Sequence, residues 1–485
     1  MRGSSRRGFL KASGAAAALA AAKAVPGLAA AGSSGPVKVW ATYRDKRYTA
    51  AEALVWKPLS GVAADAIVLD PGTTKQEILG FGGAMTDATC YVLSQMTAEE
   101  RGAVMHDLFS PKEMALNVCR TCIGASDYSR TAYTFDESDE PDPELKKFSI
   151  EHDKAYLLPI LREARKVNPD LFLFSSPWTP PGWMKPNGSM LGGSMRKHSY
   201  DPYARYFLKF LEAYKADGVT IDAVTIQNEV DADQDGGMPA CLWGQEYEIE
   251  FVKDHLGPTL RGAGFKTKIW VLDHNYSLWG RAIAELSDPK AYEYIDGIAW
   301  HGYVGDATTM TRVHETFPQK NAYWTEGGPD ITAPDYATDW AKWGEVFNGV
   351  VNNWSRSITA WNVALDEAGK PNIGPFPCGG VITVENGSHK VTKSGQYWAF
   401  AHFSKHVKRG AKVFATNGTE IAPTGGLIEN QASTALTHTG FRNPDGSFVV
   451  VLANRGAERR VQLVHGLNAL ELDLPADSLY TLQWS

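Results

Sequence analysis

The sequence predicts an α/β fold, a (β/α)8 TIM barrel with an appended antiparallel β-sandwich built from both chain ends. Between residues 77 and 404, eight short apolar runs alternate with longer segments of helical period, which is typical of β/α units. Residues 405–485 instead alternate apolar and polar positions between turns such as Asn-Pro-Asp-Gly. Residues 32–76 have the same strand character, in VKVWATY and AIVLD, so we expect them to join the C-terminal strands in one sandwich.

Residues 1–31 have the pattern of a twin-arginine export signal. Arg6 and Arg7 are followed by Phe-Leu-Lys, by an alanine-rich stretch and by a small-residue site at 29–31. A membrane helix is the alternative, but the stretch contains Lys23 and is shorter than the ~20 apolar residues that a bilayer requires. No later segment is long enough either. We therefore expect passage through the twin-arginine export machinery, no stable membrane insertion, and a mature protein in the periplasm or outside the cell.

Eight apolar runs rich in Val, Ile and aromatic residues are the predicted barrel strands. They cover residues 78–83, 115–122, 171–176, 221–228, 268–274, 296–302, 321–327 and 357–365. Helical candidates lie between them, and several begin at an Asp, Thr or Pro suited to a helix start. They include residues 97–109, 152–167, 202–218, 245–264 and 339–354.

Composition and charge exclude several classes of protein. The chain has 485 residues, of which 44% are apolar and 21% charged, as expected for a globular protein with one large domain and a smaller companion. Removal of residues 1–31 takes away five basic residues and no acidic one, so the formal net charge changes from −7 to −12. Such an acidic surface disfavours nucleic acid and anionic lipid as partners.

The five cysteines do not form a disulfide framework, because their number is odd and they are scattered along the chain. Cys119 and Cys122 form a C-x-x-C within a predicted strand, where this spacing places the two side chains on opposite faces. We therefore expect neither a shared metal nor a disulfide between them.

Polar and aromatic residues follow the C-terminal ends of the predicted strands, which is where active sites lie in barrels of this kind. One strand-end carboxylate alone is more often a solvated loop charge, but polar groups at six or more ends of one rim favour a functional site. In strand order, the residues are Arg120 and Asp127, Trp178, Asn228 and Glu229, Asp273 and His274, His301 and Tyr303, Glu326, and Trp361 and Asn362.

Glu229 and Glu326 end the fourth and seventh predicted strands, so a closed barrel would make them face each other across its mouth. Such a pair suits glycoside hydrolysis: one carboxyl group protonates the leaving oxygen, and the other, ionised, attacks the anomeric carbon or positions water. Asn228 offers an amide that can donate to a sugar 2-hydroxyl. Arg120, if it reaches Glu326, would lower the pKa of that carboxyl group. We therefore predict that Glu229 is the general acid/base and Glu326 the nucleophile.

The aromatic content agrees with a carbohydrate substrate. Several of the fifteen tryptophans fall at or beside predicted strand ends, where their flat faces can stack on sugar rings. Two others, Trp270 and Trp398, are expected in the core. The candidates for stacking are Trp178, Trp183, Trp300, Trp324 and Trp361.

Asp273, His274 and His301 have an alternative interpretation as the metal ligands of a barrel hydrolase. No H-x-H or H-E-x-x-H spacing accompanies them, and a role in proton relay or sugar contact needs fewer assumptions. We expect no metal and no cofactor. The sequence also contains no G-x-S-x-G, Walker or G-x-G-x-x-G motif, which argues against esterase, phosphoryl-transfer and dinucleotide functions.

Over roughly residues 37–485 the chain resembles glycoside hydrolase family 30, the group of the acid β-glucosidases (glucosylceramidases) and the β-1,6-glucanases. The resemblance implies a (β/α)8 barrel with a β-sandwich, retaining chemistry, Glu229 as the acid/base, Glu326 as the nucleophile, and no metal. It rests on GFGGAMTDA (80–88), SDYS (126–129), SSPWTPPGWMK (175–185), QNEV (227–230), GIAWHGY (297–303), TEGG (325–328), WNVALDEAGKPN (361–372) and HFSKHVKRGA (402–411).

By the same resemblance, Asp127 and Trp178 hold the outer hydroxyls of a terminal glucose. Asn228, Tyr303 and Trp361 line the same subsite, which favours glucose over xylose. The sequence departs from the lysosomal glucosylceramidases at IGPFPCGG (373–380), which has no asparagine-bearing loop, and this leaves the specificity on that side open.

The expected function is a retaining β-glucosidase of the glucosylceramidase type that acts on a β-glucoside or β-glucan. An endo-acting β-1,6-glucanase is the alternative within the same chemistry, and an open cleft would favour it over a closed pocket. A catalytically silent sugar-binding barrel and a metal-dependent hydrolase are the alternatives from other classes.

Overall fold

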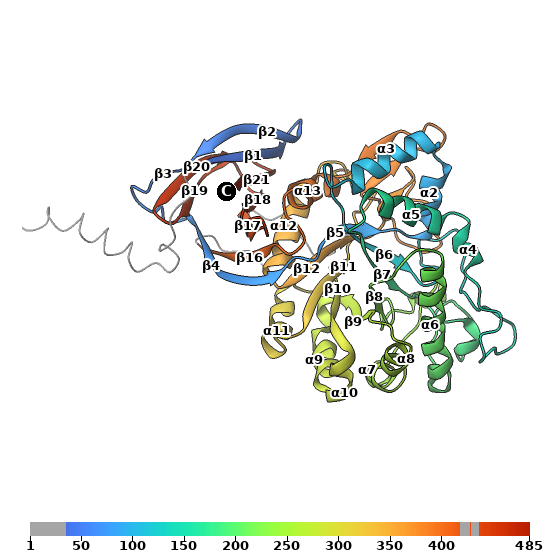
Figure 1. The fold of residues 1–485 in the computed structure, drawn as a ribbon. Coiled ribbons are helices and arrows are strands. Elements are labelled where there is room, and N and C mark those ends of the chain that lie inside the picture. The colour runs from blue at the N-terminus through green and yellow to red at the C-terminus, as the bar shows by residue number, and fades with distance from the viewer. Residues whose placement is uncertain (1–34, 418–426, 428–435) are drawn as a thin grey trace, which may run out of the picture.

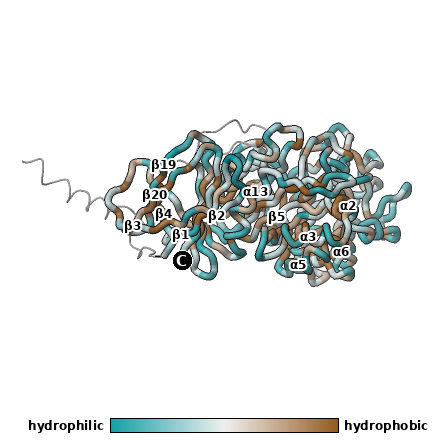
Figure 2. Tube along the Cα trace, turned by 90° about the horizontal axis from the view of Figure 1, so that it is seen from above, coloured by the Kyte–Doolittle hydropathy of each residue, from teal (hydrophilic) through white to brown (hydrophobic). Residues whose placement is uncertain are grey.

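The computed structural model describes residues 35–417, 427 and 436–485, so the predicted export signal lies outside the described residues. The chain forms two bodies, a barrel surrounded by helices and a smaller β-module that contains the first and last strands (Figure 1). Figure 2 shows the two bodies side by side with helix α13 (Gly395–Ser404) between them. Among the described helices, none is long and apolar enough to cross a membrane.

Eight parallel strands form a closed barrel, which confirms the predicted fold class. The barrel closes where the eighth strand pairs with the first, with Ile358 opposite Phe81. In chain order the strands are β5 (Gly80–Ala84), β6 (Val118–Cys122), β7 (Phe172–Ser176), β8 (Ala223–Thr225), β9 (Lys268–Asn275), β10 (Ile295–His301), β11 (Asn321–Glu326) and β12 (Ser355–Ala360).

Helices cover the outside of the barrel (Figure 1). The predicted segment 152–167 is two helices rather than one, and the predicted segment 245–264 contains a π-helical turn at Phe251–Leu256. Helix α3 begins with a capping box in which Thr97 and Glu100 satisfy each other's backbone N–H groups. The remaining bounds are α2 (Asp87–Gln95), α3 (Ala98–Phe109), α4 (Glu151–Lys154), α5 (Leu157–Val167), α6 (Tyr200–Ala216), α7 (Gln245–Glu250), α8 (Gly257–Gly262), α9 (Trp279–Ser287), α10 (Pro289–Tyr294), α11 (Thr308–Thr316) and α12 (Trp340–Asn352).

Both chain ends enter one ten-stranded sheet, as the sequence predicts. Strand β1 pairs antiparallel with the last strand β21, and β4 lies between β16 and β19. The strands are β1 (Pro36–Tyr43), β2 (Lys46–Val55), β3 (Lys57–Pro58), β4 (Ile67–Glu77), β16 (Lys412–Asn417), β17 (Leu436–Arg442), β18 (Phe448–Asn454), β19 (Arg459–His465), β20 (Asn468–Leu474) and β21 (Ser478–Trp484).

Polar contacts join the β-module to the barrel through helices α12 and α13. Asn348 of α12 donates to the Thr437 hydroxyl at 3.1 Å, and Asn352 donates to the His438 carbonyl at 2.9 Å. His402 of α13 lies within hydrogen-bond distance of Thr42 and Thr481, one from each end of the chain. These buried contacts fix the β-module beside the barrel.

Two predicted strands end earlier than their apolar patterns indicate. The fourth, predicted to reach residue 228, is regular only over Ala223–Thr225, and Glu229 has φ +51°. The eighth ends at Ala360, because Asn362 has φ +49° and left-handed backbone cannot continue a strand. The residues after it form β13 (Ala364–Leu365), which belongs to a separate sheet with β14 (Ile382–Val384) and β15 (Val391–Lys393).

One layer of inward-facing side chains, called the lower layer here because it lies below the C-terminal ends of the strands, is apolar and fills the barrel interior. Trp270 stacks on Tyr323 with ring centroids 3.9 Å apart, which places it in the core as predicted. The other members of this layer are Val118, Phe174, Ala223 and Ala299. Trp398 is only partly buried, although the sequence analysis assigned it to the core. All five cysteines are free thiols, and Cys119 and Cys122 pack in different apolar clusters.

Candidate active site

A pocket of about 620 Å³ opens at the C-terminal ends of the barrel strands. Most of the predicted site residues line it, and they come from loops that are far apart in the sequence. They are Asp127, Trp178, Asn228, Glu229, Tyr303, Glu326 and Trp361. Of the other three, Arg120 and His301 are fully buried beneath the pocket floor, and Asn362 is buried behind its wall.

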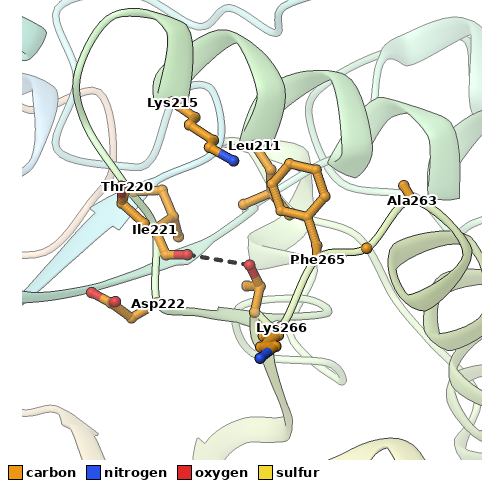
Figure 3. A pocket seen from close by; sticks show the side chains of 10 residues that line it. Leu211, Lys215, Thr220, Ile221, Asp222, Ala263, Phe265 and Lys266 are labelled. Atoms are coloured by element: carbon orange, nitrogen blue, oxygen red, sulfur yellow. Dashed lines mark hydrogen bonds between the residues drawn. The ribbon is translucent and has the colours of Figure 1, made fainter.

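A second hollow lies at the opposite end of the barrel, where the chain enters β8 and β9 (Figure 3). Its walls include Lys215, Asp222 and Phe265, and the Thr267 hydroxyl donates to the Ile221 carbonyl across it at 3.2 Å. Asp222 is the only carboxylate among its lining residues, so a second carboxylate that could act with it is missing there. The paired carboxylates therefore distinguish the C-terminal pocket from this one.

Glu229 is held in place by backbone contacts to both neighbouring strands. Its N–H donates to the Asp273 carbonyl at 3.0 Å, and the Asn228 N–H donates to the Pro177 carbonyl at 2.8 Å. With φ at +51°, the backbone turns at Glu229 and does not continue the strand. Glu326, in contrast, is the last residue of β11.

Arg120 connects three members of the site from beneath the pocket. Its fully buried guanidinium forms an ion pair with Glu326 and another with Asp273 at 2.7 Å, and it donates to Oδ1 of Asn228 at 2.9 Å. The guanidinium also lies 4.7 Å from the ring centre of Trp178. Because Oδ1 of Asn228 is occupied by Arg120, its NH2 group remains available for a ligand.

Asp273 is the central buried anion of the site, a place that its position at the end of the fifth predicted strand does not by itself indicate. Its carboxylate accepts from Arg120, from His301 at 3.0 Å, and from three hydroxyls, those of Ser176, Thr225 and Thr325. Burial raises the pKa of Asp273, but Arg120 and His301 outweigh burial, so the pKa is held well below its usual range. The negative charge in turn orients both cations.

His301 lies between the two predicted catalytic carboxylates. Its Nδ1 is 3.3 Å from Oε1 of Glu229, and its Nε2 is 3.8 Å from Oε2 of Glu326. Burial lowers the pKa of His301, but the charge of Glu326 and the hydrogen bonds to Asp273 and Glu229 outweigh it and raise the pKa to about 9. At neutral pH the imidazole therefore holds a proton next to Glu229.

The pKa values of the two glutamates differ from the expectation based on Arg120 alone. Arg120 reaches Glu326 and lowers its pKa, as predicted, but burial exceeds the effects of His301 and Arg120, so the pKa of Glu326 is raised overall. The pKa of Glu229 is lowered, because His301 and His274 outweigh its burial. Each oxygen of Glu326 nevertheless accepts from a donor, Arg120 at Oε2 and the Tyr303 hydroxyl at Oε1, the latter at 3.0 Å.

Two tryptophans form an aromatic wall of the pocket. Trp178 and Trp361 stack with ring centroids 5.1 Å apart, and both line the cavity. The expectation that Trp300 and Trp324 face a sugar is wrong, because both are fully buried in the hydrophobic core between strands and helices. Trp183 is partly buried and donates its indole N–H to the Asp136 carbonyl at 3.0 Å, outside the pocket lining.

Asp127 presents an acceptor to the pocket. Its side-chain Oδ1 is buried and has no hydrogen-bond partner among the described residues. Burial raises the pKa of Asp127 well above its usual range, and the charges of Glu326 and Glu229 raise it further. The backbone carbonyl of Asp127 accepts from Ile373 at 2.8 Å and Gly374 at 3.2 Å, so the start of segment 373–380 packs directly on this residue.

Asn362 does not line the pocket, although its position at a strand end predicts that it would. It is fully buried and accepts from the Thr86 hydroxyl at 2.9 Å, so it supports the turn after β12 from behind the pocket wall. Direct contact with substrate stays a prediction for this residue.

Several lining residues were outside the predicted set. His274 was a strand-end candidate for proton relay, sugar contact or metal binding, and the pocket rim formed by Phe376, Pro377 and Cys378 follows no predicted strand. Leu427, which follows β16 of the β-module, donates its N–H to the Gly302 carbonyl at 2.7 Å and also reaches the pocket. Only the dipeptide Asp273-His274 gave a sequence signal for this group.

A closed parallel barrel with two glutamates and an aromatic wall at the C-terminal ends of its strands defines a glycoside hydrolase. Comparison with known families assigns it further. The profile of the "Glycosyl hydrolase family 30 TIM-barrel domain" matches residues 78–407, and that of the "Glycosyl hydrolase family 30 beta sandwich domain" matches residues 426–482. The chain therefore belongs to glycoside hydrolase family 30, and its glycosidase class and fold agree with the sequence analysis.

Relatives with two different names match along most of the chain. The endo-1,6-beta-D-glucanase of Neurospora crassa is 33% identical over 398 residues, which cover 79% of this chain and 80% of the relative. The lysosomal acid glucosylceramidase of Mus musculus is 31% identical over 441 residues, which cover 86% and 83%. The solved structure of an endo-beta1,6-glucanase has a TM-score of 0.82 at 29% identity and covers 93% of this chain and 99% of that one.

Proposed function

We propose that this glycosidase hydrolyses β-linked glucose with retention, with Glu229 as acid/base and Glu326 as nucleophile. One observation carries the proposal: both glutamates line the same pocket and face the two nitrogens of a single imidazole, that of His301. The two donors on Glu326, Arg120 and Tyr303, suit a carboxylate held for attack, since a hydrogen bond donated to each oxygen favours the ionised form.

In the first step, the Glu326 carboxylate attacks the anomeric carbon as the glycosidic C–O bond breaks. Glu229 gives a proton to the leaving oxygen, and the product is a covalent glycosyl-enzyme. In the second step, Glu229 takes a proton from water, which attacks the same carbon and releases Glu326 as a carboxylate. Two inversions at one carbon give net retention.

The proton for the first step is shared between His301 and Glu229. In the free enzyme the lowered pKa of Glu229 and the raised pKa of His301 place this proton on the imidazole. Nδ1 of His301 is 3.3 Å from Oε1 of Glu229, so the proton can pass to Glu229 as the leaving oxygen gains charge.

The sugar-binding part of the pocket has donors, an acceptor and an aromatic wall suited to glucose. The NH2 group of Asn228 can donate to a 2-hydroxyl, an interaction that strengthens as the oxocarbenium-like transition state forms. Asp127 can accept from outer hydroxyls, and Trp178 and Trp361 present ring surface.

We propose a β-1,6-linked glucan as the first candidate substrate, supported by the relatives named endo-1,6-β-glucanases. A β-glucoside with an apolar aglycone, as for glucosylceramidases, is the second candidate. It is favoured by the apolar side of the pocket, where Phe376, Pro377, Pro329, Val304 and Leu427 lie.

Product analysis separates these candidates. The enzyme is incubated with gentio-oligosaccharides, cellobiose, laminaribiose and glucosylceramide, and NMR follows the anomer of the first-formed sugar. Release of β-configured oligosaccharides from long gentio-oligosaccharides supports endo-acting β-1,6-glucanase activity. Glucose from glucosylceramide alone supports the second candidate, and α-configured first products contradict retention.

We also propose export through the twin-arginine machinery, on the basis of Arg6 and Arg7 and the alanine-rich stretch after them. Replacement of both arginines by lysine should leave the protein inside the cell, whereas the natural sequence should appear in the periplasm or medium. Immunoblots of cell fractions measure this, and equal secretion of the two forms would contradict the proposal.

A further inference from the structure

Three side chains that can bind a metal meet at the floor of the catalytic pocket. One ligand atom from each of Glu229, His274 and His301 lies within 4.8 Å of the other two. Oε1 of Glu229 is 3.3 Å from Nδ1 of His301 and 3.6 Å from Nδ1 of His274. The proposed hydrolysis transfers a proton between Glu229 and His301, whereas His274 acts only through its effect on the pKa of Glu229.

These separations fit a tetrahedral ion. Two ligands bonded to Zn2+ at about 2.0–2.1 Å with a tetrahedral angle lie roughly 3.3 Å apart. The two separations from Oε1 of Glu229, 3.3 and 3.6 Å, are close to this value, and a ligand atom of each histidine lies within 4.8 Å of the other. Two imidazoles with one carboxylate suit Zn2+ or Cu2+ and do not suit Mg2+ or Ca2+, which prefer oxygen ligands.

Each histidine is also supported in the way that metal-binding histidines usually are. Nε2 of His274 lies 2.5 Å from Oδ1 of Asp231, and Nε2 of His301 lies 3.0 Å from Oδ1 of Asp273. A carboxylate on Nε2 holds the N–H there, so Nδ1 of each ring faces Glu229. Both rings therefore present the atom that a metal would need. An ion at this point would displace the Nδ1 proton that His301 shares with Glu229 in the free enzyme.

Nδ1 of His274 is a buried polar atom that the described residues leave without a hydrogen bond. The side chain is 7% exposed, so this nitrogen is not simply a solvated group. A buried acceptor without a partner costs free energy, which a ligand at this point would recover. The open pocket that Glu229 and His274 both line provides access from solvent.

We propose that Glu229, His274 and His301 form a site for a divalent transition-metal ion such as Zn2+, and that the bound ion inhibits the enzyme. The inhibition, which rests on the proposed role of Glu229, follows because a carboxylate that ligates an ion cannot protonate the leaving oxygen. A sugar whose leaving oxygen approaches Glu229 then competes with the ion. This predicts the opposite response to EDTA from that of a metal-dependent hydrolase.

The experiment titrates ZnCl2 into enzyme that has been treated with EDTA and dialysed into metal-free buffer near pH 8, where imidazole ligands are more readily deprotonated. Hydrolysis of 4-nitrophenyl β-glucoside gives activity, and calorimetry gives Zn2+ affinity. We expect reversible inhibition that raises the apparent KM, recovery with EDTA, and no effect of Mg2+ at the same concentration. Co2+ should give the visible absorption of a tetrahedral complex.

Variants test whether the ion binds at this site. His274→Gln should lower Zn2+ affinity by more than about 10-fold. Asp231→Asn should lower it by about 10-fold, because it removes the carboxylate that holds Nε2 of His274. Asp231 is half-exposed, so its substitution should not disturb folding. The matched control is His389→Gln, which removes a surface histidine paired with Glu100 at 2.9 Å and should leave both affinity and activity unchanged.

Equal Zn2+ affinity in the natural enzyme and in both pocket variants would overturn the proposal, as would Zn2+ bound at the site with activity unchanged. Loss of activity on EDTA treatment with recovery by Zn2+ would also overturn it, in favour of the metal-dependent alternative. The proposed hydrolysis is tested separately, by product analysis of the metal-free enzyme. Its failure would leave the binding data intact.

Discussion

The barrel interior consists of two layers that are equally buried and chemically opposite. The lower layer, with Phe174, Trp270 and Tyr323, is apolar and stacked. Two residues further along several of the same strands, the inward side chains are polar: Val118 gives way to Arg120, Phe174 to Ser176, Ala223 to Thr225, Ala299 to His301 and Tyr323 to Thr325.

A spacing of two residues along each strand therefore separates the lower layer, which stabilises the barrel, from the upper layer, which forms the site. Side chains at i and i+2 face the same way, so both layers point inward. Burying the polar side chains of the upper layer costs free energy, and hydrogen bonds and ion pairs around Asp273 offset this cost. Substitutions in the upper layer should reduce activity more than stability, and substitutions in the lower layer should do the reverse.

The largest expected effect is that of Glu326→Gln. An amide cannot attack the anomeric carbon, so kcat on glucan should fall by roughly 10⁴-fold or more, while thermal unfolding stays near that of the natural enzyme. Steady-state kinetics and calorimetry measure the two quantities. Glu471→Gln, at an exposed position of β20, is the control, and near-normal turnover by the Glu326 variant would sink the nucleophile assignment.

Glu229→Ala should cost less, and its cost should depend on the leaving group. Loss of the acid/base should reduce hydrolysis of glucan by about 10²–10⁴-fold. Hydrolysis of an activated aryl glucoside should suffer far less in the first step, because its leaving group needs no proton. A comparison of kcat/KM for the two substrates tests this, and equal losses would argue against a proton-donating role.

Trp270→Ala tests the lower layer. Removal of this stacked indole should lower the free energy of unfolding by about 3–5 kcal/mol. The folded fraction should retain most of its kcat, since Trp270 lies below the pocket and does not line it. Urea unfolding gives the loss, and the partly buried Trp398→Ala is a control that should lose less. A greater effect on kcat than on stability would contradict the separation of the layers.

The pH dependence should separate a histidine of the site from a histidine of the domain contact. The pKa of His301 is raised to about 9, so activity should fall as pH rises through about 9. The stability that this shift contributes is fully present below pH 6.5 and is lost as the pH rises from 6.5 through about 9. In His301→Gln the alkaline fall near this pH should disappear, and an unchanged profile would contradict the relay.

His402, between barrel and β-module, should make stability depend on pH in the opposite direction from His301: stability falls as the pH is lowered. Burial lowers its pKa to about 3, so the unfolded chain binds the proton first and stability is lost as pH falls below 6.5. His402→Gln should weaken this acid sensitivity in urea titrations while the alkaline activity profile stays unchanged. The same acid dependence in both forms would refute this assignment.

The smallest expected effect is that of Phe376→Ala at the pocket rim. Phe376 is 38% exposed and lies on the apolar side of the pocket, so its loss should raise KM for an apolar aglycone by roughly 5- to 10-fold. Short gentio-oligosaccharides should change less. Equal effects on both substrates would show that the rim does not select the aglycone.

Much of the site was predictable because barrel geometry converts strand ends into neighbours. Glu229 and Glu326 were found in this way, and so was Arg120 as a contact of Glu326. The same rule failed for Trp300 and Trp324, because proximity to a strand end does not say which face a side chain takes. Trp300 precedes His301, whose ring points into the barrel, so alternation places the indole outside.

The sequence by itself determined the order of strands, the residues at their ends and the joining of both chain ends in one β-module. These features depend on local periodicity and on residue types that a single segment carries. Only the tertiary structure decided the directions of the glutamate pKa values, the place of His274 beside Glu229, and the rim at residues 373–380. Each of these depends on burial and on contacts between segments remote in the chain, which no local pattern records.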